Sequence, residues 1–299
     1  MQNCVEIVMR SKNDGPLIGG ALRAVHRQRY PAQVRLVHID SGSTDRTLGV
    51  IAAYQPWKLI KIRPEEYVPG VVLNRGMRET AGDWVVFLNS DAEPADDDWL
   101  GELLAAAITD PGTGAAFSRQ LSRPDCDAVF AHDYERCFGP HRESAQWEHF
   151  FSMVSCVVSR AAWLQQPFRE DLRYAEDDEW SKRLKHHGWN VAFANDSRAI
   201  HSHNYTLGQA YRRSRGDAFA QAASNPPPPP LALGLGLAAV GAARDAVKDW
   251  HWCRDQRRRR EWPRAAAVRV AQRFGKFIGL RAGRVHYTRA PIVAVPVTP

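Results

Sequence analysis

The sequence predicts an α/β protein built on a doubly wound, mostly parallel sheet that is flanked by helices and followed by a C-terminal helical extension. Three observations support this fold class. Short apolar runs rich in β-branched residues are typical of buried parallel strands. Helical spacing of apolar residues separates these runs, and a polar cluster follows each of them. The resulting order of strand, helix, strand, helix, strand is the start of a doubly wound sheet.

The elements are assigned in order along the chain. Strands are expected at residues 5–9, 34–39 and 84–88, with helices at residues 17–29 and 71–80 between them. A later helix is expected to begin at the acidic residues 176–179 and to end at Gly188, because acids favour the first turn of a helix and glycine often stops one. A strand at residues 190–194 follows this helix.

Five consecutive prolines, residues 226–230, mark a boundary, because proline fits neither inside a helix nor inside a central strand. We therefore expect a catalytic domain over residues 1–225 and a proline linker with a basic helical extension over residues 226–299. Helices are expected at residues 231–252 and 262–277, followed by an extended stretch to residue 299.

One segment of the extension, residues 234–239, matches the GxGxxA pattern of dinucleotide-binding sites. It follows prolines instead of a strand, so the structural context of such a site is missing. Gly234 and Gly236 are therefore interpreted as positions of helix packing.

Composition limits the classes of protein to which the chain belongs. Of the 299 residues, 44% are hydrophobic and 24% are charged, which is ordinary for a folded globular protein. The five cysteines include no CxxC pair, so neither a disulfide framework nor a zinc ribbon is indicated, and a reducing compartment is expected. The first residues do not resemble a signal peptide, and no apolar window reaches the roughly 18 to 20 residues of a spanning helix. We expect a cytoplasmic protein that is peripheral on the inner face of the membrane.

Charge is distributed unevenly along the chain. Residues 231–299 hold 14 Lys and Arg against 4 Asp and Glu, a net +10, whereas residues 1–230 hold 26 against 29, a net −3. A basic tail on a mildly acidic body indicates an anionic partner. The tail has no recognised nucleic-acid motif, so an anionic membrane surface contacted by residues 231–260 is preferred over nucleic acid. A solvated helical face, packing on the body and a dimer contact are the open alternatives.

Three polar clusters are expected to meet at one edge of the sheet. They are residues 10–14, 40–45 and 89–94, and each follows a predicted strand. Ligands of open α/β sheets bind beyond the carboxyl ends of the strands, so the clusters predict a ligand site. Asp40 is placed to accept hydrogen bonds from a base or a ribose. The alternative is a loop and a helix cap, for which Ser, Thr, Asp and Gly are also typical.

Asp91 and Glu93 are candidate metal ligands, because residues two apart in an extended segment point to the same side. Carboxylate oxygens in this arrangement suit Mg²⁺ or Mn²⁺ bridging a diphosphate. A simple turn is the alternative. His201 and His203 have the same spacing, and we assign His203 as a further ligand of that metal or of a zinc ion. Surface histidines explain this spacing equally well.

The acidic residues 176–179 supply more carboxylates than a helix start needs, so one of them is a candidate general base. Other catalytic classes lack their motifs in this chain. No GxxxxGK[ST], HExxH or GxSxG pattern occurs, which gives no support to P-loop phosphoryl transfer, zincin or serine hydrolase chemistry.

Taken together and in this order, the motifs resemble those of the inverting glycosyltransferases of family 2, which have the GT-A fold. The motifs are MRSKND, HIDSGSTDRT, LNRGMRETAGDWVVFLNSDAEP, YAEDDEW with Arg183, and HSHNY, and they span residues 5–205. The RSKN start, the stretch at residues 117–125 and HSHNYT are most similar to the rhamnosyltransferase branch.

The resemblance implies roles for individual residues. The nucleotide-sugar donor would be bound by Ser11, Asn13, Asp40, Ser41, Ser43, Asn74, Arg75, Ser90 and Asp91, with Asn74 and Arg75 near its diphosphate or sugar. Asp91 and Glu93 occupy the family's DxD position, where a Glu in place of the second Asp departs from the pattern. Asp177 would be the catalytic base, and Glu176 and Asp178 would support it.

These roles describe an in-line displacement with inversion, in which Asp177 takes the proton of the acceptor hydroxyl as its oxygen attacks the anomeric carbon. The QxxRW motif of processive synthases is absent, so transfer of a single sugar is expected. The implied enzyme is a hexosyltransferase of polysaccharide biosynthesis that moves L-rhamnose from dTDP-rhamnose to a cell-surface glycan or lipid-linked glycan acceptor. Two alternatives stay open, namely a UDP- or GDP-sugar donor and a catalytically silent nucleotide-sugar-binding scaffold.

Overall fold

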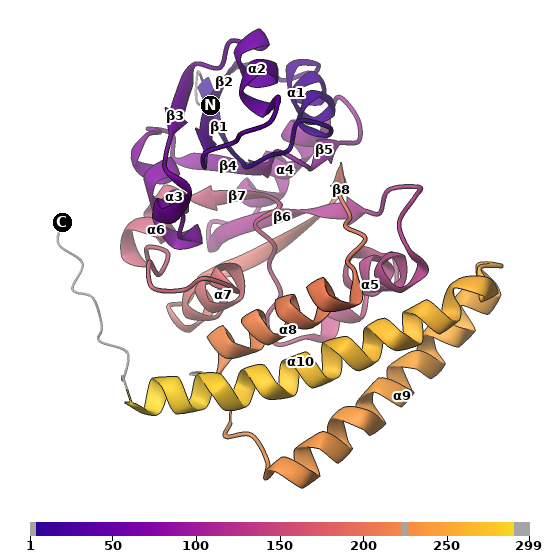
Figure 1. Cartoon of the computed structure of the whole chain (residues 1–299). Helices are drawn as coiled ribbons and strands as arrows, with labels where there is room; N and C mark the ends of the chain where they lie inside the picture. Colours follow the sequence, from indigo (N-terminus) through magenta and orange to yellow (C-terminus); the bar gives the residue numbers. More distant parts are fainter. Residues whose placement is uncertain (1–3, 223–225, 290–299) are drawn as a thin grey trace. The chain divides into compact units, whose positions relative to one another are not determined.

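The computed structural model describes residues 4–222 and 226–289 (Figure 1). The strands are β1 Cys4–Ser11, β2 Gln33–Asp40, β3 Lys58–Lys61, β4 Trp84–Asn89, β5 Glu93–Pro94, β6 Thr113–Leu121, β7 Ser155–Ser159 and β8 Asn190–Ile200. The α-helices are α1 Ile18–His26, α2 Thr47–Ala53, α3 Pro69–Arg78, α4 Trp99–Ile108, α5 Ala128–Phe138, α6 Arg160–Gln165, α7 Glu176–His186, α8 Leu207–Gln221, α9 Leu231–Asp255 and α10 Trp262–Arg289. Short 3₁₀ helices lie at Pro64–Glu66, Glu143–Gln146 and Arg259–Glu261.

The chain divides into two compact units. The first contains the chain up to Asp125, together with Tyr134–Leu172 and Glu176–Ser202. The second contains Cys126–Asp133, Arg173–Ala175 and the chain from His203 onward.

The first unit is built on one eight-stranded sheet with the strand order β3-β2-β1-β4-β7-β6-β8-β5. β1 pairs in parallel with β2 and β4, and β2 pairs in parallel with β3, which confirms the predicted doubly wound start. β6 and β8 are also parallel, whereas β7 is antiparallel to β4 and β6, and β5 is antiparallel to β8. The sheet is therefore mixed, and its continuous parallel part carries the three strand ends predicted to form the ligand site.

Alternate residues of the central strands enter two apolar cores, one on each face of the sheet. Ile7 and Leu88 belong to a core that also contains residues of α1 and α4. Val8 and Phe87 belong to the other core, which contains residues of α3, α6 and α7. The alternation follows from the pleat of a strand, in which successive side chains point to opposite faces. Helices cover both faces of the sheet, which explains why its strands are continuously apolar in sequence.

The second unit joins the first half of α5 to helices α8, α9 and α10. Phe130 of α5, Ala210 of α8 and Val268 of α10 belong to its apolar core. Ion pairs cross this core, because Asp249 of α9 lies 2.6 Å from His132 of α5 and 2.7 Å from Arg269 of α10. Both carboxylate and guanidinium are buried, so each charge is compensated by its partner where water is excluded.

Glycines let α10 approach α8 closely. Gly275, Gly279 and Gly283 are spaced by four residues and therefore share one face of the helix. A Cβ atom on Gly279 would lie 2.2 Å from the carbonyl oxygen of Arg215 in α8. The two helix backbones are thus in contact along a stripe that has no room for side chains.

The helices predicted after the prolines are present as α9 and α10. Gly234 is a packing position as predicted, since its Cβ atom would meet the ring of Phe277, but Gly236 has no non-local heavy atom within 4 Å. The predicted boundary after residue 225 falls inside the second unit, because α8 packs along α10. The extended stretch predicted up to residue 299 lies outside the described residues.

Within residues 4–222 and 226–289, no helix is both long enough and apolar enough to cross a membrane. The location at the inner face of the membrane stays a prediction.

Candidate active site

A pocket of about 280 Å³ lies at the carboxyl ends of β1, β2 and β4. It is lined by Arg10, Ser11, Lys12, Asp14, Ser41, Tyr67, Asn89, Ser90 and Asp91. All three polar clusters contribute residues to this lining, so the structure brings together the strand ends that the sequence placed at one edge. This pocket is the candidate site for the donor.

The loop after β2 is held by the carboxylate of Asp40. This carboxylate is fully buried and accepts hydrogen bonds from the hydroxyls of Ser11 and Ser43, at 2.8 and 2.6 Å, and from the backbone N–H groups of Gly42 and Ser43. Four hydrogen bonds satisfy an ionised carboxylate. Asp40 therefore shapes the loop from within, and the predicted contact with a base or ribose stays a prediction.

Behind this loop, Nε2 of His38 lies 2.9 Å from the hydroxyl oxygen of Ser11. Burial lowers the pKa of His38 to about 4, so the imidazole is neutral at physiological pH. Because the Ser11 hydroxyl donates to Asp40, Nε2 of His38 is the donor and the Ser11 oxygen the acceptor. The hydrogen bonds from His38 to Ser11 and from Ser11 to Asp40 hold the end of β1 against the end of β2.

Ser41 differs from its neighbours in the same loop. It is 1% exposed and lines the pocket, and its hydroxyl has no hydrogen-bond partner among the described residues. A buried hydroxyl without a partner is costly, by about 1–3 kcal/mol, unless a ligand or water satisfies it. Ser41 therefore presents to the pocket a hydroxyl that is open to a hydrogen bond with a ligand.

Asn13, which has a positive φ of 57°, holds the loop after β2 through two hydrogen bonds. Its backbone N–H donates to Ser43 Oγ at 2.9 Å, and its side-chain oxygen accepts from the N–H of Thr44 at 2.8 Å. Asn13 and Ser43 therefore hold each other, and neither belongs to the residues that line the pocket.

Asn74 requires a correction. Its amide nitrogen donates to the carbonyl of Phe168 and to Glu170, and its amide oxygen accepts from the indole N–H of Trp163 and from the N–H of Phe168, all at 2.8–3.0 Å. The side chain is buried and its donors and acceptors are occupied, so it clamps the segment after α6 and has no group left for a diphosphate. This contact joins residues about ninety positions apart, so local sequence gave no sign of it.

Arg75 also lies outside the pocket lining. Its guanidinium is 3.6 Å from Glu79, the residue that follows the end of α3, in an i, i+4 pair on a partly exposed surface. The predicted approach of Arg75 to the diphosphate stays a prediction.

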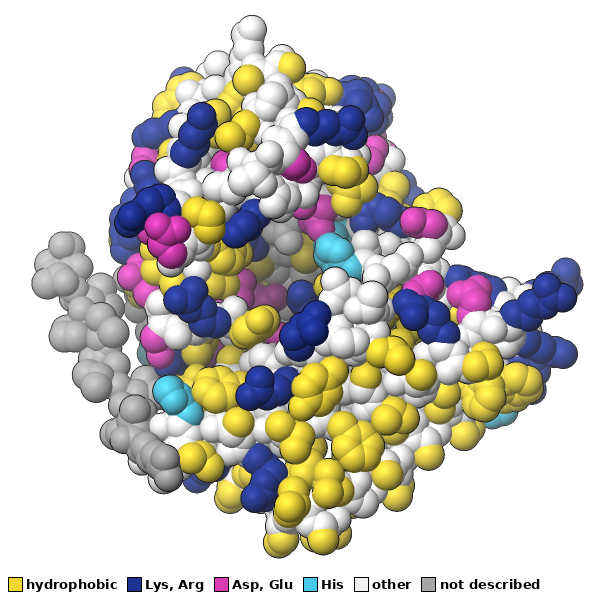
Figure 2. Space-filling model, in the orientation of Figure 1, with side chains coloured by type: hydrophobic (Ala, Val, Ile, Leu, Met, Phe, Trp, Pro, Cys, Tyr) yellow, Lys and Arg dark blue, Asp and Glu magenta, His cyan; other side chains and the backbone are white. Residues whose placement is uncertain are grey.

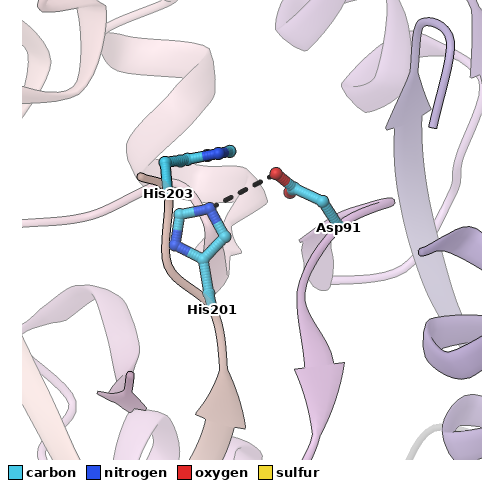
Figure 3. Close-up of side chains that lie close together, drawn as sticks. All are labelled: Asp91, His201 and His203. Atoms are coloured by element: carbon cyan, nitrogen blue, oxygen red, sulfur yellow. Dashed lines mark ion pairs between the residues drawn. The ribbon is translucent and has the colours of Figure 1, made fainter. Parts of the chain in front are cut away.

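Asp91 and His201 form the centre of a candidate metal site (Figure 3). Oδ2 of Asp91 lies 3.5 Å from Nε2 of His201, and the hydroxyl of Tyr134 lies 2.6 Å from the other imidazole nitrogen, Nδ1. The backbone oxygen of Asp91 accepts a hydrogen bond from Arg123. Tyr134 therefore orients the ring, which leaves Nε2 directed at the carboxylate.

His203 follows His201 by two residues, and one ligand atom from each of Asp91, His201 and His203 lies within 4.8 Å of the others. Glu93 is not among them, which corrects the predicted ligand set. The oxygen Oε2 of Glu93 lies over α1, where it would be 2.5 Å from a Cβ atom on Gly20. The same-side rule requires an extended segment, but residues 90 and 91 form a turn before β5, so Asp91 and Glu93 diverge.

The chemistry of this set fits a divalent transition metal. One carboxylate and two imidazoles differ from the oxygen ligands that Mg²⁺ prefers, so Mn²⁺ matches the set better than Mg²⁺ does, and zinc, the other ion expected from the histidine pair, also suits the imidazoles. A second observation agrees with a cation here. Asp14 has a pKa raised mainly by burial, and the negative charge of Asp91 raises it further. A cation in this part of the pocket would relieve that repulsion.

The acidic residues predicted as the catalytic group stand in the first turn of α7. Burial, with the negative charge of Glu176 as the next cause, raises the pKa of Asp177 to about 7. The backbone N–H of Asp178 donates to Asp177 at 2.9 Å and partly opposes this rise. A carboxylate with a pKa near neutrality is suited to accept a proton during a reaction.

The two flanking acids have different surroundings. Asp178 is paired with His149 at 2.9 Å and with Lys182 at 2.8 Å, so its charge is compensated. Glu176 lies 3.8 Å from the guanidinium of Arg10. Among the residues that the structure describes, Asp177 forms no ion pair, whereas both of its neighbours face a cation.

Arg10 connects the pocket to α7. It lines the pocket, donates to the side-chain oxygen of Asn89 at 2.9 Å and faces Glu176 with its other terminal nitrogen, Nη1. Nη1 is buried and has no hydrogen-bond partner among the described residues. Arg10 therefore offers an open donor with positive charge between the pocket and the acidic helix.

Sequence reasoning did not assign roles to Arg10, Asp14, Tyr67 or Tyr134, and it chose His203 over His201. Arg10 and Asp14 stand in the first polar cluster, so their positions were visible although their roles were not. Tyr67 and Tyr134 follow no strand end, and nothing in the local sequence indicated them.

Residues 6–165, more than half of the chain, match the family described as Glycosyl transferase family 2. The chain is 26% identical over 221 residues to the O-antigen chain rhamnosyltransferase RfbN of Salmonella typhimurium, which covers 70% of this chain and 69% of that protein. It is 28% identical over 190 residues to the O-antigen chain rhamnosyltransferase WbaN of Salmonella anatum, which covers 60% of each. The chain thus spans less than two thirds of the second relative.

Solved structures with related folds include the mannosyltransferase PcManGT from Pyrobaculum calidifontis in complex with GDP-Man and Mn²⁺. Its TM-score is 0.62 at 20% identity, with 91% of this chain and 86% of that chain covered. TarS of S. aureus in complex with UDP has a TM-score of 0.53 at 15% identity, with 98% and 94% covered. At such identities the likeness shows the fold alone.

Proposed function

Because the chain belongs to glycosyl transferase family 2 and shares its GT-A fold with solved relatives, we propose that it transfers L-rhamnose from dTDP-rhamnose to a hydroxyl of a glycan acceptor with inversion. The single observation that carries this proposal is the pocket at the carboxyl ends of β1, β2 and β4. It combines an open hydroxyl, Ser41, with a carboxylate, Asp91, and a cation, Arg10, that reaches the acidic helix. These are groups that a nucleotide-diphosphate sugar needs.

The choice of sugar and acceptor is supported by the two curated relatives, which are both named as O-antigen chain rhamnosyltransferases. We therefore infer a growing cell-surface polysaccharide, free or lipid-linked, as the acceptor. The same pocket would accept a UDP- or GDP-sugar if these names do not extend to this chain.

The transfer step assigned to this site uses Asp177 as the general base. The acceptor oxygen attacks the anomeric carbon from the side opposite the nucleotide, its proton passes to the carboxylate of Asp177, and the bond from the anomeric carbon to the diphosphate oxygen breaks. The leaving diphosphate takes the electron pair of that broken bond, so negative charge develops on its oxygen. Arg10 is placed to hold that charge with its open donor Nη1.

Asp91, His201 and His203 would hold Mn²⁺, which supplies Lewis-acid stabilisation of the diphosphate when bound. Tyr134 keeps the His201 ring in the required orientation through its 2.6 Å contact with Nδ1.

Calorimetric binding of dTDP-rhamnose, UDP-glucose and GDP-mannose, each with and without Mn²⁺, tests the donor. We expect dTDP-rhamnose alone to bind tightly, with Mn²⁺ enhancing its affinity. Ser41→Ala is expected to weaken donor binding by about fivefold to tenfold, the loss of one hydrogen bond of about 1–1.5 kcal/mol. Preference for another nucleotide sugar would refute dTDP-rhamnose as the donor but would leave the proposal of a sugar transferase intact.

A transfer assay with Asp177→Asn separates catalysis from binding alone, because an amide cannot take the proton. We expect donor affinity to be kept and turnover to be lost. Wild-type turnover in this variant would refute Asp177 as the base, and no transfer by the wild type with any bound donor would favour a silent scaffold.

A further inference from the structure

The outward face of α9 is unusually apolar for a surface helix. Leu233, Leu237, Val240 and Val247 are each more than half exposed, and their spacing places them on one face of the helix. The opposite face carries seven buried residues, Gly234, Ala238, Ala242, Asp245, Ala246, Asp249 and Cys253, which pack inside the second unit. Exposed aliphatic side chains in one contiguous set are typical of an interaction surface.

The charged residues of α9 are sorted between the same two faces. Asp245 and Asp249 are buried and paired with Arg273 and Arg269 of α10. The basic side chains are exposed instead, and they are Arg244, Lys248, Arg254, Arg257, Arg259 and Arg260, counting the turn that follows the helix. One exposed acid, Asp255, stands among them and lies 3.0 Å from Arg254. The outward face is therefore positive as well as apolar.

These two properties are separated along the helix axis. Residues 231–243 contain no charged residue, whereas residues 244–260 hold seven Lys and Arg against three Asp. At 1.5 Å per residue the uncharged part is about 20 Å long. Figure 2 shows the result on the second unit, where hydrophobic side chains gather over α9 and α10, and Lys and Arg lie at the end where the two helices are joined.

We propose that α9 docks on an anionic lipid bilayer at a tilt, with its first half entering the boundary between headgroups and acyl chains and its basic end lying among the headgroups. An interfacial helix binds through buried apolar area and through attraction to anionic lipid. A helix that lies flat on a membrane would need apolar and basic side chains along its whole length. α9 instead has its uncharged residues in the first half and its basic residues in the second. Trp250, exposed at 38%, stands within the basic half, where the headgroup region favours an indole.

A second copy of the chain fits this face less well. Parallel pairing of two α9 helices would place their basic halves against each other, and antiparallel pairing would bury arginines against leucines. Both arrangements leave charge without compensation. The bilayer compensates the charge and covers the apolar side chains at once. This docking goes beyond sugar transfer and does not depend on the donor.

Flotation of the full chain with vesicles tests the docking. The vesicles are made of phosphatidylcholine alone or of phosphatidylcholine mixed with phosphatidylglycerol. We expect binding to the mixed vesicles that weakens as salt is raised, because screening removes the headgroup attraction. Absence of binding to the mixed vesicles at low salt would overturn the proposal.

Two matched valines test the tilt. Val240 and Val247 are 68% and 55% exposed and lie two turns apart on the same face. We expect Val240→Arg to weaken binding to the mixed vesicles by at least about tenfold, since it places a charge in the inserted half. Val247→Arg should leave binding equal or stronger, because it adds a cation at the headgroups. Equal weakening by both variants would overturn the tilt, and no effect of Val240→Arg would overturn the assigned face.

Ile108→Arg is the control, since Ile108 is an aliphatic residue of the first unit with 64% exposure. It should bind vesicles as the wild type does. Light scattering tests whether the outward face of α9 instead forms a dimer contact. A dimer that Val240→Arg dissociates, together with no vesicle binding by the wild type, would assign the face to a second copy and overturn the proposal.

Discussion

The ionisation of Asp177 is expected to set the pH dependence of sugar transfer. Burial and the charge of Glu176 raise the pKa of this carboxyl to about 7, and only its ionised form accepts a proton. With that pKa, about one eleventh of the enzyme is active at pH 6 and about ten elevenths at pH 8. The value of kcat/KM should therefore rise about tenfold between pH 6 and pH 8.

The assay is initial-rate transfer at saturating Mn²⁺ over this pH range. Glu176→Gln should move the rising limb to lower pH, because it removes the negative charge that opposes ionisation of Asp177. Glu179→Gln is the matched control, since Glu179 stands in the same helix but pairs with Arg183. A limb that Glu176→Gln leaves in place, or that persists in the residual activity of Asp177→Asn, would refute the assignment.

The raised pKa of Asp177 also makes the free energy of unfolding depend on pH. A carboxyl whose folded pKa exceeds its unfolded value of about 3.9 keeps a proton that the unfolded chain releases. The contribution of Asp177 to folding is therefore most favourable at acidic pH and is lost as pH rises from about 4 to about 7. Above neutrality Asp177→Asn should unfold at higher denaturant concentration than the wild type.

Three further predictions follow from the contacts. His201→Ala should weaken Mn²⁺ binding at least about tenfold by calorimetry, because it removes a ligand from a set of three; unchanged affinity would exclude this metal site. Gly279→Ala should lower the free energy of unfolding by about 1–3 kcal/mol, because the new methyl group would clash with α8. Gly236→Ala should instead stabilise α9 by up to about 1 kcal/mol, because this glycine has open space around it. Chemical denaturation compares the two variants, and equal effects would contradict the packing argument. Asn74→Ala should destabilise the fold by about 2–4 kcal/mol while the folded protein keeps its donor affinity, and a selective loss of donor binding would restore Asn74 as a ligand.

Local sequence pattern was sufficient for the parallel half of the sheet. β1, β2 and β4 are continuous apolar runs because both of their faces are covered, and this property is visible in sequence. β6 Thr113–Leu121 was not predicted as a strand, and its polar residues explain why. Ser118 is buried, and its hydroxyl lies 2.8 Å from both Ser155 and Ser197. A strand whose polar side chains satisfy each other inside the sheet lacks the apolar pattern that identifies strands.

The candidate site was predictable to the extent that strand ends determine it. Clusters at the ends of three parallel strands meet by topology alone, which placed Ser41 and Asp91 correctly at one pocket. The errors arose where one turn or one distant segment decides the direction of a side chain. The turn before β5 separates Glu93 from Asp91, and the segment after α6 occupies Asn74.

The ion pairs around Asp249 have a consequence for synthesis of the chain. His132 and its partner Asp249 are 117 residues apart, and Asp133 and Arg269 are 136 apart. At the usual speed of translation, roughly 6 to 23 s pass between the emergence of His132 and that of Asp249 from the ribosome. During that interval Phe130, which the finished protein buries, has no C-terminal helices to pack against. The nascent chain therefore exposes an apolar segment in its middle until the last helices are made, and this is the period in which a chaperone would protect it.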